Sequence, residues 1–143
     1  MGIVIAVASG KGGTGKTSVT GGVAAALAMA GQRVLCIDMD IGLRNLDISL
    51  GLSDRALMDF SDVAEGRCPL VRAAVNHPDL PGLALLTAPM TLSSALTEEA
   101  VRRMLDTARS LYDYVLIDSP AGLGAGFRMA CCGADRAIVV STN

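Results

Sequence analysis

Two lysines lie close together in a glycine-rich stretch near the start of the chain. Lys11 and Lys16 fall within SGKGGTGKTS, residues 9–18, and they are the only lysines among 143 residues. Glycines let backbone N–H groups approach phosphate oxygens at the start of a helix, where the helix dipole favours negative charge. A lysine after the last glycine neutralises phosphate charge, and the hydroxyl that follows it binds Mg²⁺. The pattern G-x-x-x-x-G-K-T over residues 10–17 therefore predicts a phosphate-binding loop (P-loop) for a nucleoside triphosphate.

The same loop also fits a dinucleotide-binding fingerprint. Gly10, Gly12 and Gly15 form G-x-G-x-x-G after an apolar run, and Asp38 follows at the end of the next apolar run. Only the triphosphate site, however, needs a lysine directly after the last glycine. Lys16 therefore favours a triphosphate, and a dinucleotide remains the alternative ligand.

An acidic residue far along the chain supports the triphosphate. The stretch YDYVLIDSPAG, residues 112–122, contains an apolar run that ends in Asp118. A buried strand is a rigid support that can place a carboxylate near a metal ion bound with phosphates, as a Walker B acid does. A dinucleotide site has no need of such an element. The loop and the strand end together predict a nucleotide bound with Mg²⁺.

Short aliphatic runs and helical patterns alternate along the chain, which indicates an α/β fold with a mostly parallel sheet. The runs are bounded by turn residues, as buried parallel strands are. The strands are expected at residues 3–8, 34–38, 83–87, 114–118 and 137–141. The helices are expected from Lys16 to about Ala30, at 98–112, and as shorter pieces near 57–65 and 69–76.

The helix at 98–112 has the clearest pattern. Thr97 is a suitable N-cap, and the glutamates at 98 and 99 precede the arginines at 102 and 103 by four residues, a favourable order for ion pairs. One face of this helix is apolar at the 3.6-residue period, and we expect it to pack on the sheet. That face contains Val101, Met104, Leu105, Ala108, Leu111 and Tyr112.

Composition restricts the possible function classes. A net charge of −2 gives no general attraction to nucleic acid, so no nucleic-acid partner is expected. The four cysteines show no C-x-x-C spacing, and we expect buried reduced thiols. The sequence shows neither a signal peptide nor an 18-residue apolar span, so we expect a soluble cytoplasmic protein.

The chain ends at Asn143, directly after an apolar run. A doubly wound sheet normally continues beyond such a strand. We therefore expect residues 1–143 to form one P-loop domain of three layers that is the N-terminal portion of a longer family domain, truncated on its C-terminal side.

Three segments resemble the ParA/MinD family of ATPases, and the similarity runs through essentially the whole chain. GKGGTGKT, residues 10–17, closely resembles the family's deviant Walker A motif. IDMDIGLRNLDISLG, residues 37–51, and DSPAG, residues 118–122, are similar to its cell-division branch. The partitioning branch would tend towards D-x-D-P-Q, and the flagellar-number regulators towards D-T-A-A-G.

The resemblance implies roles for individual residues. Lys11 would reach across an ATP-dependent homodimer to the partner's phosphates, Asp40 would position the attacking water near Mg²⁺, and Asp118 would hold Mg²⁺ through water. The predicted catalytic set is Lys11, Lys16 and Asp40, and the predicted Mg²⁺ set is Thr17, Asp40 and Asp118. The predicted nucleotide-binding residues are Gly10, Lys11, Gly12, Gly13, Thr14, Gly15, Lys16, Thr17, Ser18 and Gly122.

By this resemblance the function would be that of an ATP-hydrolysing switch that dimerises around ATP and helps to place the division septum through partner proteins. A longer family form would attach to the inner face of the cell membrane through a C-terminal helix beyond Asn143. Three alternatives remain: a partitioning or flagellar-number regulator, an iron–sulfur relative suggested by Cys131 and Cys132, and a nucleotide-binding fragment without activity.

Overall fold

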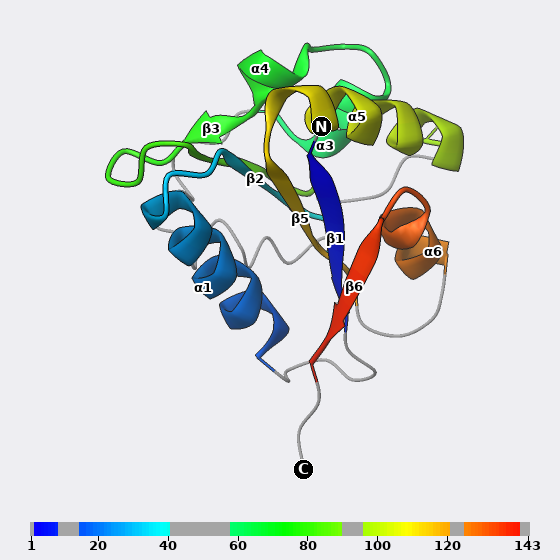
Figure 1. The fold of residues 1–143 in the computed structure, drawn as a ribbon. Coiled ribbons are helices and arrows are strands. Elements are labelled where there is room, and N and C mark those ends of the chain that lie inside the picture. Colours follow the sequence, from blue (N-terminus) through cyan, green and yellow to red (C-terminus); the bar gives the residue numbers. More distant parts are fainter. Residues whose placement is uncertain (1, 9–14, 41–57, 90–95, 121–124, 141–143) are drawn as a thin grey trace.

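The computed structural model describes residues 2–8, 15–40, 58–89, 96–120 and 125–140. They form one six-stranded sheet in the order β3-β4-β2-β5-β1-β6, in which only β3 is antiparallel to its neighbour (Figure 1). The strands are β1 (Ile3–Ala8), β2 (Val34–Asp38), β3 (Val75–Asn76), β4 (Leu83–Leu86), β5 (Tyr114–Asp118) and β6 (Arg136–Val139). The helices are α1 (Lys16–Met29), α3 (Phe60–Ala64), α4 (Leu70–Ala73), α5 (Glu98–Leu111) and α6 (Ala125–Cys131). The predicted α/β class with a mostly parallel sheet is confirmed.

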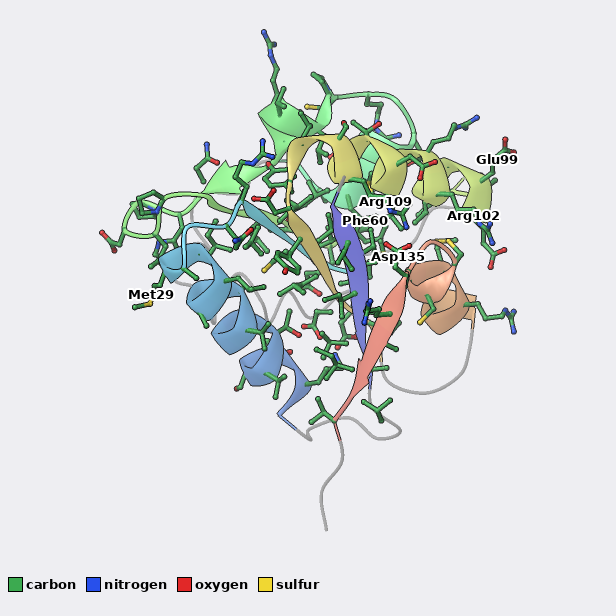
Figure 2. The ribbon with its side chains drawn as sticks, viewed as in Figure 1. Met29, Phe60, Glu99, Arg102, Arg109 and Asp135 are labelled. Carbon is green, nitrogen blue, oxygen red and sulfur yellow. The ribbon has the colours of Figure 1, made fainter. Side chains whose placement is uncertain are left out.

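The sheet is buried on both faces, and successive residues of a strand enter different cores. On one face, Val34 and Cys36 of β2 pack in a cluster with Ala24 and Ala28 of α1. On the other face, strand residues pack with α3, α4, α5 and α6, and Figure 1 shows α1 on the opposite side of the sheet from α5 and α6. This second cluster includes Leu35, Ile37, Leu86, Val115, Ile117 and the fully buried Phe60 of α3, which is labelled in Figure 2. The aliphatic runs of the sequence are thus the central layer of three.

Small side chains allow α1 to lie close to the sheet. Its buried residues recur about every fourth position, with one extra glycine, and all of them except the lysine are small. They are Lys16, Thr20, Gly21, Ala24 and Ala28. The helix ends at Met29, whose side chain is 77% exposed (Figure 2), and the following turn contains Gly31 with φ +89°. The predicted span is therefore confirmed, and a glycine in the left-handed conformation follows the helix, as is common at helix ends.

The helix α5 forms as its sequence pattern predicts. Thr97 caps it, since its Oγ1 accepts a hydrogen bond from the Ala100 N–H at 3.1 Å. Four of the six predicted face residues are buried, while Leu111 and Tyr112 are half-buried at its end. The predicted pair of Glu99 with Arg103 forms at 3.7 Å, but both side chains are largely exposed, so it adds little stability.

Several predicted boundaries differ from the structure. The helix expected over 69–76 ends at Ala73, and Val75 and Asn76 instead form β3, paired antiparallel with β4. Two residues are too few to show a strand period, and the pairing with Leu85 and Ala84 decides their conformation. β4 ends one residue earlier than predicted, and β6 begins one residue earlier and ends at Val139.

No helix in the described ranges is long and apolar enough to cross a membrane. The two longest ones, α1 and α5, have 14 residues each. At a rise of about 1.5 Å per residue such a helix reaches about 21 Å, less than the ~30 Å thickness of a bilayer core.

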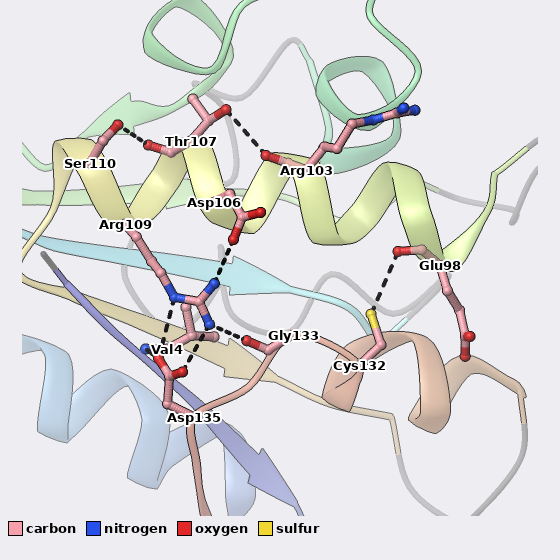
Figure 3. A network of polar contacts seen from close by, with 10 residues as sticks. All are labelled: Val4, Glu98, Arg103, Asp106, Thr107, Arg109, Ser110, Cys132, Gly133 and Asp135. Carbon is pink, nitrogen blue, oxygen red and sulfur yellow. Dashed lines mark hydrogen bonds and ion pairs between the residues drawn. The ribbon is translucent and has the colours of Figure 1, made fainter.

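A polar clamp joins α5, β1 and the turn before β6 (Figure 3). The Asp135 carboxylate accepts a hydrogen bond from the Val4 N–H at 2.9 Å and another from Arg109 Nη2 at 3.0 Å. Arg109 also donates to the Gly133 carbonyl and to Asp106 Oδ1. The Val4 N–H, followed by Arg109, holds the pKa of Asp135 below its ordinary value. The clamp fixes the edge strand β6 to the first strand of the sheet.

We predict that Asp135→Asn lowers the free energy of unfolding by up to about 1 kcal/mol at neutral pH, because it weakens charge-assisted hydrogen bonds at a side chain that is 44% exposed and screened by water. A carboxyl whose pKa is lowered by folding stabilises the native state above its unfolded pKa, about 3.9, and loses that effect as the pH falls. The difference between the variant and the wild-type protein should therefore shrink below about pH 4 in urea titrations. Asp106→Asn is the control, since Asp106 meets the same arginine but is 71% exposed. A deficit in Asp135→Asn that persists unchanged at low pH would contradict the role of the charge.

Candidate nucleotide site

The carboxyl ends of three parallel strands meet at one point of the sheet. β5 lies between β1 and β2, and its last residue, Asp118, is in register with Val7 of β1 and Asp38 of β2. β1 and β2 are consecutive strands that do not pair, so the strand order makes a crossover here. In open α/β sheets, ligands bind outside the carboxyl ends of the strands at such a point.

The start of α1 faces this edge of the sheet. Gly15 precedes the helix with φ +84° and ψ 12°, a left-handed conformation that residues with a Cβ rarely adopt. No side chain caps the helix at Gly15, and the helix begins with Lys16 and Thr17. The first backbone N–H groups of a helix lack partners within it and can bind an anion.

A buried ion pair connects α1 to β5. Lys16 Nζ lies 2.5 Å from Asp118 Oδ1, and the two side chains are 7% and 0% exposed. Two charges so far removed from water must compensate each other, since either one alone would be strongly destabilising. The lysine and the acid predicted from separate motifs, 102 residues apart, are therefore in direct contact.

Thr17 binds the second oxygen of the same carboxylate. Its hydroxyl donates to Asp118 Oδ2 at 2.9 Å. One helical turn further on, the Thr20 hydroxyl donates a hydrogen bond to the Lys16 carbonyl at 2.9 Å. This bond gives the buried hydroxyl a partner inside the helix. Asp118 thus accepts hydrogen bonds from Lys16, a predicted phosphate ligand, and from Thr17, a predicted metal ligand.

Asp40 completes the charged cluster from the end of β2. Its Oδ2 lies 4.0 Å from Lys16 Nζ, and its side chain is 20% exposed. Burial raises the pKa of Asp40 and the nearby Asp118 carboxylate raises it further, while Lys16 acts in the opposite direction. A partly buried carboxyl with a perturbed pKa in a charged cluster is typical of functional sites, although structural networks also produce it.

Asp38 has a different place from Asp40. It is fully buried, and its Oδ1 accepts a hydrogen bond from the Asp40 N–H at 3.0 Å. This contact shapes the backbone after β2 and presents Asp40 towards Lys16. Asp38 thus orders the backbone that carries Asp40.

The oxygen atoms of this cluster fit a hard cation next to a phosphate. Thr17 offers a hydroxyl, and Asp40 and Asp118 offer carboxylates. Mg²⁺ prefers such oxygen ligands and keeps several waters, so it is normally bound by one or two carboxylates together with phosphates. The described residues contain no group of three or more His, Cys, Asp or Glu that could hold a metal by themselves. The oxygen atoms of the cluster are of the kind that Mg²⁺ binds together with phosphates.

The predicted site residues divide into two groups. The structure brings together Lys16, Thr17, Asp40 and Asp118, with Gly15 at the helix start and Ser18 exposed on the first turn of α1. The remaining predicted residues lie outside the described ranges: Gly10, Lys11, Gly12, Gly13, Thr14 and Gly122.

Ser119 is a supporting residue that the sequence analysis did not single out. It is fully buried directly after β5, and both its hydroxyl and its backbone N–H donate to the Val7 carbonyl. These bonds tie the segment after Asp118 to the end of β1. The contact joins residues 112 positions apart, so no local signal in the sequence could have identified it.

The cysteines show no pairing with one another in the structure. All four are free thiols, and no group of three or more potential metal ligands is found among the described residues. Cys36 is fully buried, which raises its pKa to about 12, with Asp118 as a smaller cause. The prediction of buried thiols is wrong for Cys68, Cys131 and Cys132, which are half-buried because they lie at the ends of short elements near the surface.

The domain has a parallel sheet, a helix that begins in the sequence G-K-T, and a carboxylate at the end of a strand. These features define an α/β domain of the P-loop NTPase class. A family model described as an AAA domain matches residues 2–143, so the chain belongs to that family.

Septum site-determining MinD proteins are among the relatives of this chain, which confirms the predicted resemblance. The chain is 43% identical to MinD of Bacillus subtilis over 99% of its own length and 54% of the relative's. The MinD of the Aquifex aeolicus MinC:MinD complex has 42% identity and a TM-score of 0.86 over 96% of this chain and 55% of that one. Pyrococcus horikoshii MinD, solved with Mg-ADP, has 30% identity and a TM-score of 0.84 over 99% and 58%. The chain spans about half the length of these relatives.

A double-mutant cycle tests the buried pair. We expect Lys16→Met and Asp118→Asn each to lower the free energy of unfolding by about 2–4 kcal/mol without nucleotide, since each removes one partner of a buried ion pair. The double variant should lose clearly less than the sum, with a coupling of about 1.5–3 kcal/mol. Urea unfolding supplies the four values. The exposed pair of Arg33 with Asp113 is the control and should show much weaker coupling. Additive losses at Lys16 and Asp118 would mean that the pair does not stabilise the fold.

Thiol labelling tests the burial of Cys36. We expect a thiol reagent at mildly alkaline pH to modify three cysteines in the native protein and all four in denaturant, since Cys36 is fully buried with a pKa of about 12. Cys36→Ala should leave the native count unchanged and lower the denatured count by one. A native count that falls in Cys36→Ala would show that Cys36 is accessible.

Proposed function

We propose that the protein is an ATP-binding and ATP-hydrolysing switch of the MinD type that acts in placement of the division septum. The observation that carries this proposal is the contact of Lys16 and Thr17 with Asp118, beside Asp40, at the carboxyl edge of the sheet. The similarity to MinD proteins over nearly the whole chain supports it.

ATP and Mg²⁺ are the proposed ligands. The Mg-ADP bound to the Pyrococcus horikoshii relative supports this choice, as do the oxygen ligands found here. Lys16 would bind phosphate oxygens through its ammonium, while the hydroxyl of Thr17 and the carboxylates of Asp40 and Asp118 would hold Mg²⁺. When bound, Mg²⁺ neutralises negative charge that develops on the transferred phosphoryl group.

The chain's own residues would contribute positioning and charge. Phosphoryl transfer requires mainly these two contributions. Asp40 extends from the end of β2, held there by the bond from its N–H to Asp38, and would orient the attacking water. The glycines at 10, 12, 13 and 15 with Thr14 and Ser18 would bind phosphates, and the Gly122 N–H would contact the terminal one.

Lys11 is the residue proposed to couple hydrolysis to dimerisation. In an ATP-dependent homodimer it would reach the partner's phosphates and stabilise transition-state charge, as an arginine finger does. We further propose that division-regulator proteins bind the switch, supported by the MinC:MinD complex of Aquifex aeolicus. Location in the cytoplasm, with peripheral attachment to the cell membrane in a longer form, is part of the same proposal.

Nucleotide binding is the first test. Lys16→Ala should weaken Mg-ADP binding by about 10- to 100-fold, because a charge-assisted hydrogen bond contributes about 1.5–3 kcal/mol. Lys11→Ala is the matched control, since it removes the other lysine and should leave much of the binding intact. Isothermal titration calorimetry measures both. Binding of NADH in place of ATP and ADP would support the dinucleotide site instead.

Turnover against protein concentration is the second part of this experiment. The specific ATPase activity of the wild-type protein should rise with its concentration, and Lys11→Ala should abolish that rise. Equal turnover by the two proteins would exclude a lysine acting in trans. Binding of Mg-ATP without turnover at any concentration would favour a nucleotide-binding module without activity.

A further inference from the structure

A cavity lies at the outer edge of the sheet, beside β3 and away from the nucleotide site. It is formed by the segment before α3, the turn from α3 into α4, and β3 itself, and its volume is about 360 Å³. In the order β3-β4-β2-β5, two strands separate this edge from Asp118 (Figure 1). Apolar groups line much of the cavity, namely Met58, Pro69, Ala73 and Val75. The cavity therefore offers an apolar surface that the proposed function does not use.

Met58 is an apolar side chain of this cavity that is held in place by its backbone. Its side chain is 42% exposed. Its carbonyl accepts a hydrogen bond from the Thr87 hydroxyl at 3.2 Å, and the Phe60 N–H donates to the Thr87 carbonyl at 2.8 Å. The fully buried Phe60 fixes the same segment to the core. A contact surface that is already ordered loses little conformational entropy when a partner binds.

Positive charge lies beside the cavity. The described residues that line it include two arginines and no acidic residue. Arg67 is already paired, since its guanidinium lies 2.9 Å from a carboxylate oxygen of Asp62 and 2.9 Å from one of Glu65. Arg72 of α4 is exposed, and within the described part of the chain its guanidinium makes no ion pair. One cation at the cavity is thus available to an external anion.

The backbone of β3 offers hydrogen-bonding groups on the side away from β4. The two strands are antiparallel, with Asn76 opposite Ala84. The next residue, His77, donates its N–H to the Leu83 carbonyl at 2.8 Å. Because the bonds of an antiparallel pair alternate along the strand, the N–H and C=O of Asn76 point outward, where this residue is exposed. An extended peptide can pair with such an edge.

We infer that this edge is a docking site for an extended acidic segment of a partner protein. An apolar side chain of the segment enters the cavity, and a carboxylate two residues away, on the same face of the added strand, pairs with Arg72. The backbone of the segment bonds to Asn76. A carboxylate suits one unpaired guanidinium, whereas a phosphate monoester carries about 1.5–2 negative charges at pH 7. This docking site does not depend on the proposed nucleotide function.

The first test titrates a short, fluorescently labelled peptide in which leucine and aspartate alternate, with a threonine after each, and measures anisotropy. The wild-type protein should bind it, and Arg72→Gln should weaken binding about three- to tenfold, because a charge-assisted bond is lost. Arg136→Gln is the matched control, since it removes an exposed arginine from β6 at the opposite edge of the sheet. Equal affinities of the wild-type protein and Arg72→Gln, or equal binding of a peptide with lysine in place of aspartate, would overturn the inference.

The second test removes the backbone contact. Asn76→Pro deletes an N–H that points away from β4, a position where an edge strand tolerates proline, so the protein should fold and bind the peptide about two- to tenfold more weakly. A backbone N-methylated form of the same peptide tests the contact on the unaltered wild-type protein and should also bind more weakly. Undiminished binding of the N-methylated peptide would show that no strand is added and would overturn the inference.

Cys68 reports where the peptide binds, because it lines the cavity. Bound peptide should slow the modification of Cys68 by a thiol reagent and leave that of Cys131 unchanged, as measured by mass spectrometry of digests. Binding without protection of Cys68 would place the peptide elsewhere and contradict the docking site. Tighter binding of a phosphorylated peptide, or of vesicles that contain anionic lipid, would overturn the choice of an acidic segment as the partner.

Discussion

The contact of Lys16 with Asp118 at the edge of the buried sheet constrains where the surrounding helices and strands can lie. Each charge has lost nearly all contact with water, so each depends on the other for compensation. The first turn of helix α1 must therefore lie beside the end of β5. The parallel pairing of β5 with β1 on one side and β2 on the other supplies that position, and the hydrogen bonds of Thr17 and Asp38 refine it.

The two-sided core is what keeps the pair in place. Successive residues of β2 enter different cores, so the central strand cannot slip by one residue without exchanging its two sets of side chains. The small residues of α1 let that helix lie close to the sheet, and the position of its first turn follows. On the opposite face, α5 and the clamp of Arg109 with Asp135 fix β6 against β1. The framework is aliphatic and regular, while the charged residues gather at one edge.

The same contact orders the charged edge of the sheet. Asp118 holds Lys16 and Thr17, the residues proposed to bind phosphate and metal, in one cluster. Asp40, whose pKa is raised chiefly by burial, lies beside the same ammonium group. The opposite charges of the site are thus compensated within the fold.

Much of this arrangement follows from the sequence alone. The aliphatic runs determined four strands to within one residue, and the glycine at 31 and the threonine at 97 determined where α1 ends and α5 begins, because these are local properties of the backbone. The motif G-K-T and the strand-end Asp118 identified the two halves of the site by their chemistry. Only the tertiary structure decided that Lys16 and Thr17 share the same carboxylate, that Ser119 bonds to the end of β1, and that residues 75 and 76 form a strand. These features depend on contacts between segments distant in the sequence, and no local pattern encodes them.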